Sequence, residues 1–300
     1  MRELTGAPSP EEAWRSFFEP GDVVGIKLNP VGLPHIISAP EVVREIVAGL
    51  RMAGIPPRDI VAYDRYRKQF LQAGFDRWLP EGVRWSWATD DYDPRQLDMG
   101  GYDPDHYMET QVVLPEGNPG DPHHRRSYVA RFLTREVNKM VNLCVLKHHQ
   151  SAGITLALKN MSHGLVNNVN RSHSTPTLNT CGTFIPAVVD LPVIRQKVVL
   201  HILDGIQGAY HGGPGSKTGR YLWDHQTMYF ATDPVALDRC GWKVIDEKRA
   251  QMGLAPVGKA EPDEDSRFYR MQPEHVEIAG ALGLGVFDDS KIDLRAVPLG

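Results

Sequence analysis

The 300-residue sequence has only three cysteines and no long apolar run. Cys144, Cys181 and Cys240 lie far apart and form no C-x-x-C pair, so neither a disulfide framework nor a cysteine-ligated zinc or iron–sulfur site is supported. We interpret them as ordinary buried thiols and expect no iron–sulfur cluster in this chain. No stretch approaches the roughly 18 apolar residues of a membrane span, and residues 1–20 are polar and amphipathic. We therefore expect a soluble protein with no membrane partner, cytoplasmic, or periplasmic if an export signal was trimmed from a longer precursor.

The sequence also lacks an excess of positive charge. Its formal net charge is -4 and its pI is about 6.3. Such a chain has no global basic field, so we expect no nucleic-acid partner. The densest basic stretch, HHRR at residues 123–126, is short and is interpreted as a solvated loop.

Several motifs of well-known enzymes are missing as well. There is no G-x-G-x-x-G after the first predicted strand and no G-x-S-x-G elbow. The glycine-rich stretch at 207–220 is not a phosphate loop, because Ser216 rather than glycine precedes Lys217 and no apolar helix follows. It is expected to be either a mobile flap or a plain surface loop.

Apolar periodicity predicts alternating strands and helices. Residues 22–30 form a β-branched run, residues 40–54 repeat apolar side chains at helical spacing, and residues 59–64 are again strand-like. This order is typical of a βαβ unit with parallel strands. Further strands are predicted at 138–146, 197–205 and 227–231, helices at 153–165, 185–196, 234–253 and 274–285, and a possible last strand at Val286 and Phe287.

The alternation predicts an α/β fold in which a mostly parallel, Rossmann-like sheet carries helices on both faces. Residues 90–135 lose the periodicity and form a loop-rich insertion, with a hairpin expected around residues 111–115. We expect residues 1–300 to be a single α/β domain, or two closely packed lobes formed by residues 1–135 and 136–300.

Polar side chains follow four predicted strands at their carboxyl ends. In open parallel sheets the ligand crevice lies beyond these ends, so we expect the polar groups to share one rim. The groups are Lys27 and Asn29, then Asp64, then Lys147, His148 and His149, and finally Asp204.

The helix predicted after Lys147 adds Lys159 and His163, which are four residues apart and therefore share a face. We expect this helix to begin near Ser151 and Gly153. A helix amino end beside lysines is a natural seat for a carboxylate or phosphate. The alternative is that Lys159 and His163 simply face water.

A metal site is another possibility in this region. Four imidazoles occur within 26 residues: His148, His149, His163 and His173. Imidazole is the commonest transition-metal ligand, although adjacent strand residues point to opposite faces, so His148 and His149 cannot both face one ion within a strand. Carboxylates would have to come from elsewhere, such as Asp64. A divalent ion held by the strand-end aspartates is equally open.

Two aspartates near residue 235 have different expected roles. Asp233 precedes Pro234 and is a good N-cap, so its carboxylate is expected to bind backbone amides. Asp238 lies one turn further and either reaches the cleft or is solvated.

Four stretches, taken in order, resemble the bacterial and archaeal domain of unknown function family 362: GDVVGIKLNP, VNLCVLKHHQSAGITLALKNMSHG, LHILDGIQGAYHGGPG and FATDPVALDRCG. The matching positions are Lys27, Asn29, Lys147, His149, Lys159, Asn160, Asp204, Gly205, Asp233 and Asp238. The family has no settled activity. Some members carry cysteine-rich ferredoxin modules, which implies a link to redox partners, and some begin with a twin-arginine export signal, but this sequence shows neither feature.

Two functions are compatible with these patterns. One is an enzyme acting on a small anionic molecule, with a histidine that neighbouring lysines keep neutral near pH 7 by lowering its pKa. The other is a non-catalytic metal or ligand carrier linked to iron–sulfur partners. The candidate residues are Lys27, Asn29, Lys147, Lys159 and Asn160 for anion binding, His149, His163 and Asp204 for catalysis, and His148, His173, Asp64 and Asp238 for a metal. Substrate, metal identity and oligomeric state are left open.

Overall fold

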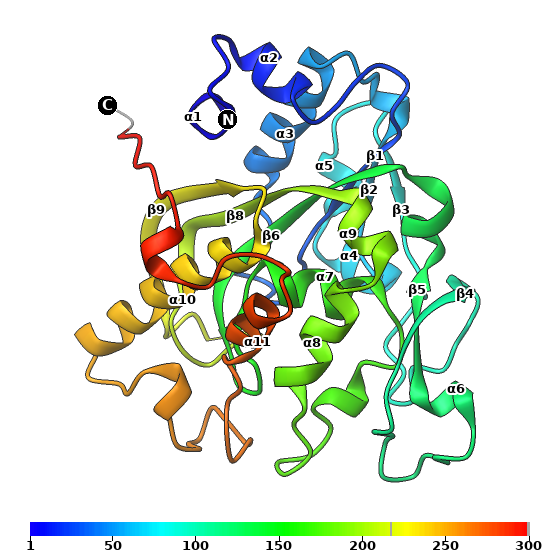
Figure 1. Cartoon of the computed structure of the whole chain (residues 1–300), viewed down its shortest axis with the longest axis vertical. Coiled ribbons are helices and arrows are strands. Elements are labelled where there is room, and N and C mark those ends of the chain that lie inside the picture. Colours follow the sequence, from blue (N-terminus) through cyan, green and yellow to red (C-terminus); the bar gives the residue numbers. More distant parts are fainter. Residues whose placement is uncertain (217, 299–300) are drawn as a thin grey trace.

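The predicted apolar runs form one seven-stranded sheet in the computed structural model, which describes residues 1–216 and 218–298 (Figure 1). Its strands are β1 (Val24–Lys27), β2 (Ile60–Tyr63), β3 (Arg84–Ser86), β6 (Lys139–His149), β7 (Gly153–Thr155), β8 (Val198–Ala209) and β9 (Leu222–Ala231). The strand order is β3-β2-β1-β6-β8-β9, with β7 paired to β6. Strands β3, β2, β1, β6 and β8 run parallel, and β7 and β9 are antiparallel, so the prediction of a mostly parallel sheet is confirmed.

The strand order reverses its direction between β1 and β6. After β1, the chain places β2 and β3 on one side of it, and then places β6 and β8 on its other side. Because β1 pairs with both β2 and β6, one continuous sheet contains strands from residues 1–135 and strands from residues 136–300. The carboxyl ends of β1 and β6 therefore flank the topological switch point, where open α/β sheets bind their ligands.

Helices cover both faces of the sheet, as predicted. They are α1 (Arg2–Thr5), α2 (Pro10–Arg15), α3 (Pro40–Met52), α4 (Arg67–Gln72), α5 (Phe75–Trp78), α6 (Pro122–Arg125), α7 (Ala157–Leu165), α8 (Cys181–Val189), α9 (Pro192–Lys197), α10 (Pro234–Gln251) and α11 (His275–Ala281). Short helical turns are η1 (Pro57–Asp59), η2 (Phe132–Glu136), η3 (Asn170–Ser172), η4 (Val257–Lys259) and η5 (Asp289–Lys291). Among the described residues no helix is both long and apolar enough to cross a bilayer.

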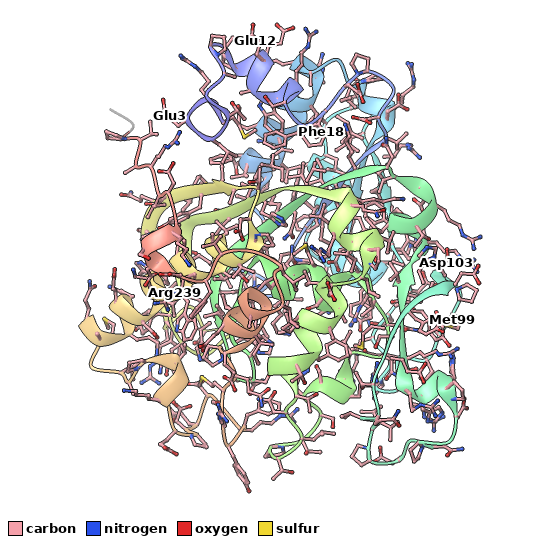
Figure 2. All side chains as sticks on the ribbon, viewed as in Figure 1. Glu3, Glu12, Phe18, Met99, Asp103 and Arg239 are labelled. Carbon is pink, nitrogen blue, oxygen red and sulfur yellow. The ribbon has the colours of Figure 1, made fainter. Side chains whose placement is uncertain are left out.

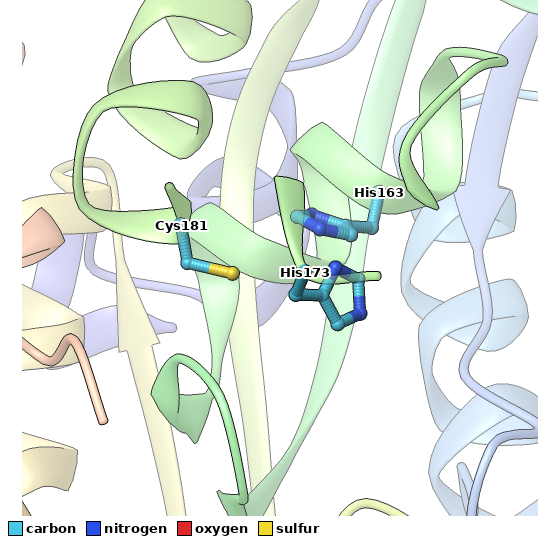
Figure 3. Close-up of side chains that lie close together, drawn as sticks. All are labelled: His163, His173 and Cys181. Atoms are coloured by element: carbon cyan, nitrogen blue, oxygen red, sulfur yellow. The ribbon is translucent and has the colours of Figure 1, made fainter. Parts of the chain in front are cut away.

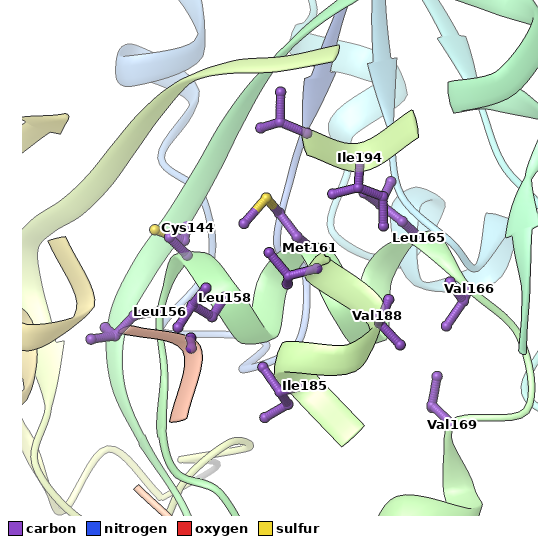
Figure 4. Packing of buried hydrophobic residues seen from close by; sticks show 14 of the residues in the cluster. Cys144, Leu156, Leu158, Met161, Leu165, Val166, Val169, Ile185, Val188 and Ile194 are labelled. Atoms are coloured by element: carbon purple, nitrogen blue, oxygen red, sulfur yellow. The ribbon is translucent and has the colours of Figure 1, made fainter. Parts of the chain in front are cut away.

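Two apolar cores lie on opposite faces of the sheet. On one face, α2 to α5 pack on alternate residues of β1, β6 and β8, and Phe18 after α2 is buried there (Figure 2). On the other face, Leu158 and Met161 of α7 pack with Ile185 and Val188 of α8 (Figure 4). Alternation along the strands decides which residues meet which core.

Several predicted boundaries were wrong. Residues 153–155 form β7, so the helix predicted from 153 begins at 157. The predicted helix at 185–196 is two helices, α8 and α9, separated near Asp190. Val286 and Phe287 are not in a strand.

The insertion contains a two-stranded sheet of β4 (Tyr102–Glu109) and β5 (Arg126–Ala130). Residues 111–115, where a hairpin was expected, lie in the connection between these strands. Residues 123–126, expected to be a solvated loop, form most of α6 and the start of β5, and Arg125 and Arg126 pair with Glu109. In the stretch 207–220, β8 continues to Ala209, and Lys217 lies outside the described residues.

His201 of β8 is a buried titratable group in this core. It is 2% exposed, and its Nδ1 accepts a hydrogen bond of 3.2 Å from Asn142 Nδ2. An imidazole that accepts at Nδ1 is neutral, with its proton on Nε2. Burial lowers the pKa of His201 to about 3.

We expect acid to destabilise the chain partly through His201. The unfolded state takes up this proton as pH falls below about 6.5, whereas the folded state resists until about 3, so folding free energy is lost over that interval. A His201→Asn variant keeps an acceptor near Asn142 but removes the titrating group. Its free energy of unfolding, measured in urea between pH 6.5 and 4, should fall less steeply, by up to about 1.4 kcal/mol per pH unit. A His35→Asn control at an exposed position should leave the slope unchanged; equal slopes in all three proteins would contradict the assignment.

Candidate functional site

Lys27 forms a buried ion pair at the end of β1. Its Nζ lies 2.7 Å from Asp64 Oδ1 after β2, and both side chains are nearly inaccessible. Asp64 Oδ2 also accepts from the backbone N–H of Tyr66, at 3.2 Å. Helix α7 has a glycine, Gly164, where it passes this lysine. A side chain there would collide with it, because a Cβ atom at Gly164 would lie 2.2 Å from Lys27 Cε. Asp64, a predicted metal ligand, is thus the counter-ion of Lys27.

Lys147, at the end of β6, also binds protein atoms. Its Nζ donates to Asn29 Oδ1 at 2.8 Å, to the Val31 carbonyl and to the Ile36 carbonyl at 3.5 Å. These acceptors are neutral, and burial together with the charge of Lys27 lowers the pKa of Lys147 to about 7. The side chain is fully buried. Lys27 and Lys147 were predicted to bind an anionic ligand, but their ammonium groups bind acceptor atoms of the protein itself.

Asparagine side chains continue the hydrogen bonds from Lys147. Asn29 Nδ2 donates to Asn160 Oδ1 at 3.0 Å, and Asn160 Nδ2 donates to Asn142 Oδ1 at 2.7 Å. Asn142 Nδ2 then reaches His201. Each amide accepts from the previous group and donates to the next, so all three are satisfied in a buried environment. We call Lys147, Asn29, Asn160, Asn142 and His201 the amide chain.

The amino end of α7 is occupied by a protein carboxylate. Asp238 of α10 accepts from the backbone N–H groups of Ala157 at 2.7 Å and Leu158 at 3.0 Å, and it is fully buried. This interaction satisfies two of the free amides at the helix start. The seat predicted for a ligand anion is filled by Asp238, which is consequently not placed to bind a metal. Asp233 caps α10 through Val235 and Ala236, as predicted.

Lys159 differs from the other two lysines. It is 4% exposed, and its Nζ takes part in none of the side-chain hydrogen bonds or ion pairs found among the described residues. Burial lowers its pKa to about 8, with a further contribution from the nearby charge of Arg65. The ammonium group is therefore still mostly protonated at pH 7.

His149 lies beside Lys159 and is held by the backbone. Its Nδ1 accepts from the N–H groups of Ser151 at 3.1 Å and Ala152 at 3.3 Å. The neutral ring consequently carries its proton on Nε2. Burial, and then the charge of Lys159, lower the pKa of His149 well below its usual value. The expected lowering of the His149 pKa by a neighbouring lysine is confirmed, although burial is the larger cause.

Three further side chains converge next to Lys159. His163 of α7, His173 after η3 and Cys181 at the start of α8 each offer one donor atom, and these atoms lie within 4.8 Å of one another (Figure 3). The rings of His163 and His173 are 5.1 Å apart, and the ring of His149 is 5.6 Å from that of His173. Such a group can hold a metal ion.

Other predicted site residues lie apart from this group. His148 points to the opposite face of β6 from His149, toward Met271 and the N–H of Gly213, as the alternation of a strand requires. Asp204 lies on the face covered by α3, where it accepts from Ala39 N at 3.1 Å and Ile206 N at 3.2 Å. The four predicted metal ligands His148, His173, Asp64 and Asp238 are thus not brought together. Asp204, predicted to orient a base, is across the sheet from His163.

The sequence interpretation missed Cys181 and Arg65. Cys181 was interpreted as an ordinary buried thiol because the cysteines lie far apart and form no C-x-x-C pair, and only the turn at 167–180 brings it beside His163 and His173. Arg65 follows Asp64 and is buried, with Nη1 donating to the Val166 carbonyl at 3.0 Å. Its position directly after a strand end was the one available signal.

The polar groups at the strand ends are enclosed and do not line an open cleft. Two surface hollows lie elsewhere: one of about 780 Å³ is bordered by Trp85, Trp87 and Arg131, and one of about 480 Å³ by Arg67 and Asp91. No predicted site residue lines either hollow. His163 and His173 are only partly buried, so the group meets solvent on their side.

The fold and the site together define an α/β protein with a mostly parallel, doubly covered sheet and a largely buried lysine, histidine and cysteine group next to the carboxyl end of β6. The chain belongs to the family described as Domain of unknown function (DUF362), whose model matches residues 24–243.

Two individual proteins show weaker likenesses to this chain. A 2-epi-5-epi-valiolone synthase from Actinomyces sp is 25% identical over 160 residues, which are 51% of this chain and 40% of that protein. This chain thus spans less than half the length of that relative. A crystal structure of a protein from Thermotoga maritima matches with a TM-score of 0.47 and 13% identity, over 80% of this chain and 58% of that one.

The side chain of Asp238 should stabilise the first turn of α7, and with it the folded protein. An Asp238→Ala variant leaves two buried N–H groups without an acceptor, so we expect the free energy of unfolding in urea to fall by about 2 kcal/mol or more. Glu247→Ala, at an exposed position on the same helix, is the control and should change it by less than about 0.5 kcal/mol. Equal stability of the two variants would contradict this role.

Proposed function

We propose that this protein is an enzyme that binds a small anionic substrate at Lys159, beside His149. The observation that carries the proposal is the isolation of the Lys159 ammonium group, which belongs to a nearly inaccessible residue and has no hydrogen-bond or ion-pair partner among the described residues. A buried charge without a partner costs several kcal/mol. A bound carboxylate, phosphate or sulfate would remove that cost.

The comparison with the other two buried lysines supports this assignment. Lys27 has Asp64 as its counter-ion, and Lys147 has an amide and carbonyl oxygens. Both are therefore neutralised or solvated by the protein itself. Lys159 lies within the same buried region but has neither kind of partner, as expected of a group that is completed by a ligand.

His149 adds a hydrogen-bond donor to the same site. Because its Nδ1 accepts from two backbone amides, the Nε2–H is left to donate to a bound anion. Because Nδ1 already accepts these hydrogen bonds, the neutral ring can accept a proton only if they break. The role of His149 in this proposal is therefore to orient the anion. His163, four residues after Lys159 on α7, contacts the hydroxyls of Ser162 and Ser172 at 3.0 Å through its two ring nitrogens.

Two further facts favour an enzyme over a passive carrier. The group lies beyond β1 and β6 at the switch point, the usual ligand position in open α/β sheets. The Actinomyces relative is a synthase. Solvent reaches the group on the side of His163 and His173, so a substrate would enter there.

Anion binding should depend on Lys159. We expect at least one of phosphate, sulfate, small carboxylates and sugar phosphates to raise the melting temperature of the wild-type protein. In Lys159→Met the affinity for that anion, measured by calorimetry, should fall by about 10- to 100-fold, because a charge-assisted hydrogen bond is lost. Lys259→Met, at an exposed lysine, is the matched control and should bind like the wild type.

The same variant separates a functional from a structural role. Without ligand, Lys159→Met should be at least as stable as the wild type, since it replaces an unpaired buried charge by an apolar side chain. A large loss of stability, or unchanged affinity for every anion in the panel, would overturn the proposal.

A further inference from the structure

The group formed by His163, His173 and Cys181 has the composition of a transition-metal site. Two imidazoles and a thiolate are borderline to soft donors, which zinc and its neighbours prefer, whereas magnesium and calcium prefer oxygen. The group contains no carboxylate. Its chemistry therefore differs from the aspartate sites that the sequence had suggested.

The separations are close to those of a bound ion. Zinc–nitrogen bonds of about 2.0–2.1 Å and zinc–sulfur bonds of about 2.3 Å place tetrahedral donors about 3.5 Å apart. The donor atoms here lie within 4.8 Å of one another. A contraction of about 1 Å, within the reach of side-chain rotation, would close them on a metal (Figure 3).

Ser172 contacts both imidazoles, and its Oγ lies 3.0 Å from His163 Nε2. Its Oγ donates its one hydrogen to the Val169 carbonyl at 2.7 Å, so it acts as an acceptor toward His173 Nδ1, also at 2.7 Å. The proton of His173 is therefore on Nδ1, and Nε2 keeps a free lone pair. A hydrogen bond from the distal ring nitrogen to a fixed acceptor is the usual second shell of a metal-bound histidine.

Three elements that are separate in the sequence deliver the three donors. His163 is on α7, His173 follows η3, and Cys181 is the first residue of α8. Cys181 Sγ has weak contacts besides these, 3.7 Å to Ser151 Oγ, 3.9 Å to the Ser172 carbonyl and 4.0 Å to Ser172 Oγ. The thiol is thus not committed to another strong interaction.

We propose that His163, His173 and Cys181 bind one transition-metal ion of the zinc class and leave its fourth position open. His149 is not a ligand, because its Nδ1 accepts from the backbone and its neutral ring carries a hydrogen on Nε2. Three protein ligands with a free position are typical of catalytic rather than structural zinc. If the anion proposed for Lys159 binds here, it occupies that fourth position; this last point alone rests on the proposed function.

Cobalt substitution tests the site in the full-length protein. Protein stripped with a chelator is titrated with Co²⁺, and we expect one ion per chain with a thiolate-to-cobalt charge-transfer band and the intense visible bands of tetrahedral coordination. Added Zn²⁺ should displace the cobalt and abolish these bands. Elemental analysis of the purified protein gives the metal that it carries.

Variants identify the ligands. Cys181→Ser should abolish the charge-transfer band, and His173→Asn should weaken Co²⁺ binding by more than about 100-fold, since loss of a second-shell partner alone costs about 10- to 100-fold. Ser172→Ala should weaken Co²⁺ binding by only about 10- to 100-fold. Cys240→Ser, a cysteine of α10 outside the group, is the matched control and should retain the band.

The outcomes are distinguishable from those for anion binding. Absence of a charge-transfer band in the wild type, or its persistence in Cys181→Ser, would overturn the metal site. If Cys181→Ser fails to fold, as judged by circular dichroism without metal, His173→Asn decides the question through the affinity for Co²⁺. Lys159→Met should keep the charge-transfer band, so loss of anion binding in that variant concerns the proposed function alone.

Discussion

A continuous row of buried hydrogen bonds holds the carboxyl ends of the central strands to helix α7. Lys147 of β6 donates to Asn29 beyond β1, Asn29 to Asn160 of α7, Asn160 to Asn142 of β6, and Asn142 to His201 of β8. Every amide in this chain is both donor and acceptor, so the polar groups are satisfied without water. In a low-dielectric interior such a network is stabilising only when it is complete, which fixes the position of α7 on the sheet.

The placement of α7 decides which groups remain for a ligand. Asn160 faces the sheet and is used by the amide chain, whereas its neighbour Lys159 lies near Cys181 and near His149, His163 and His173. Asp238 holds the amino end of the same helix from α10. Consecutive residues of one short helix thus face different surroundings, Asn160 the amide chain and Lys159 the proposed anion site, because a helix turns by about 100° per residue.

Several positive charges lie close together in this region. Lys27, Lys147, Lys159 and Arg65 lie near one another with Asp64 as the carboxylate paired to Lys27. Burial and mutual repulsion lower the pKa values of Lys147 and Lys159 to about 7 and 8. An anion, or a metal-bound anion, between Lys159 and the His163 group would relieve this repulsion, so the two proposals are electrostatically compatible.

The sequence by itself determined the local periodicities, and with them the parallel sheet, its helices on both faces and the polar residues at the strand ends. It also indicated the cap formed by Asp233, because that motif lies within four residues. Tertiary structure alone decided that Lys27 meets Asp64, that Asp238 caps a helix some 80 residues away in the chain, and that Cys181 joins His163 and His173. The physical reason is that period and propensity fix the face on which a side chain lies, whereas its partner depends on how separate elements pack, and a short irregular segment such as 167–180 carries no periodic signal of its path.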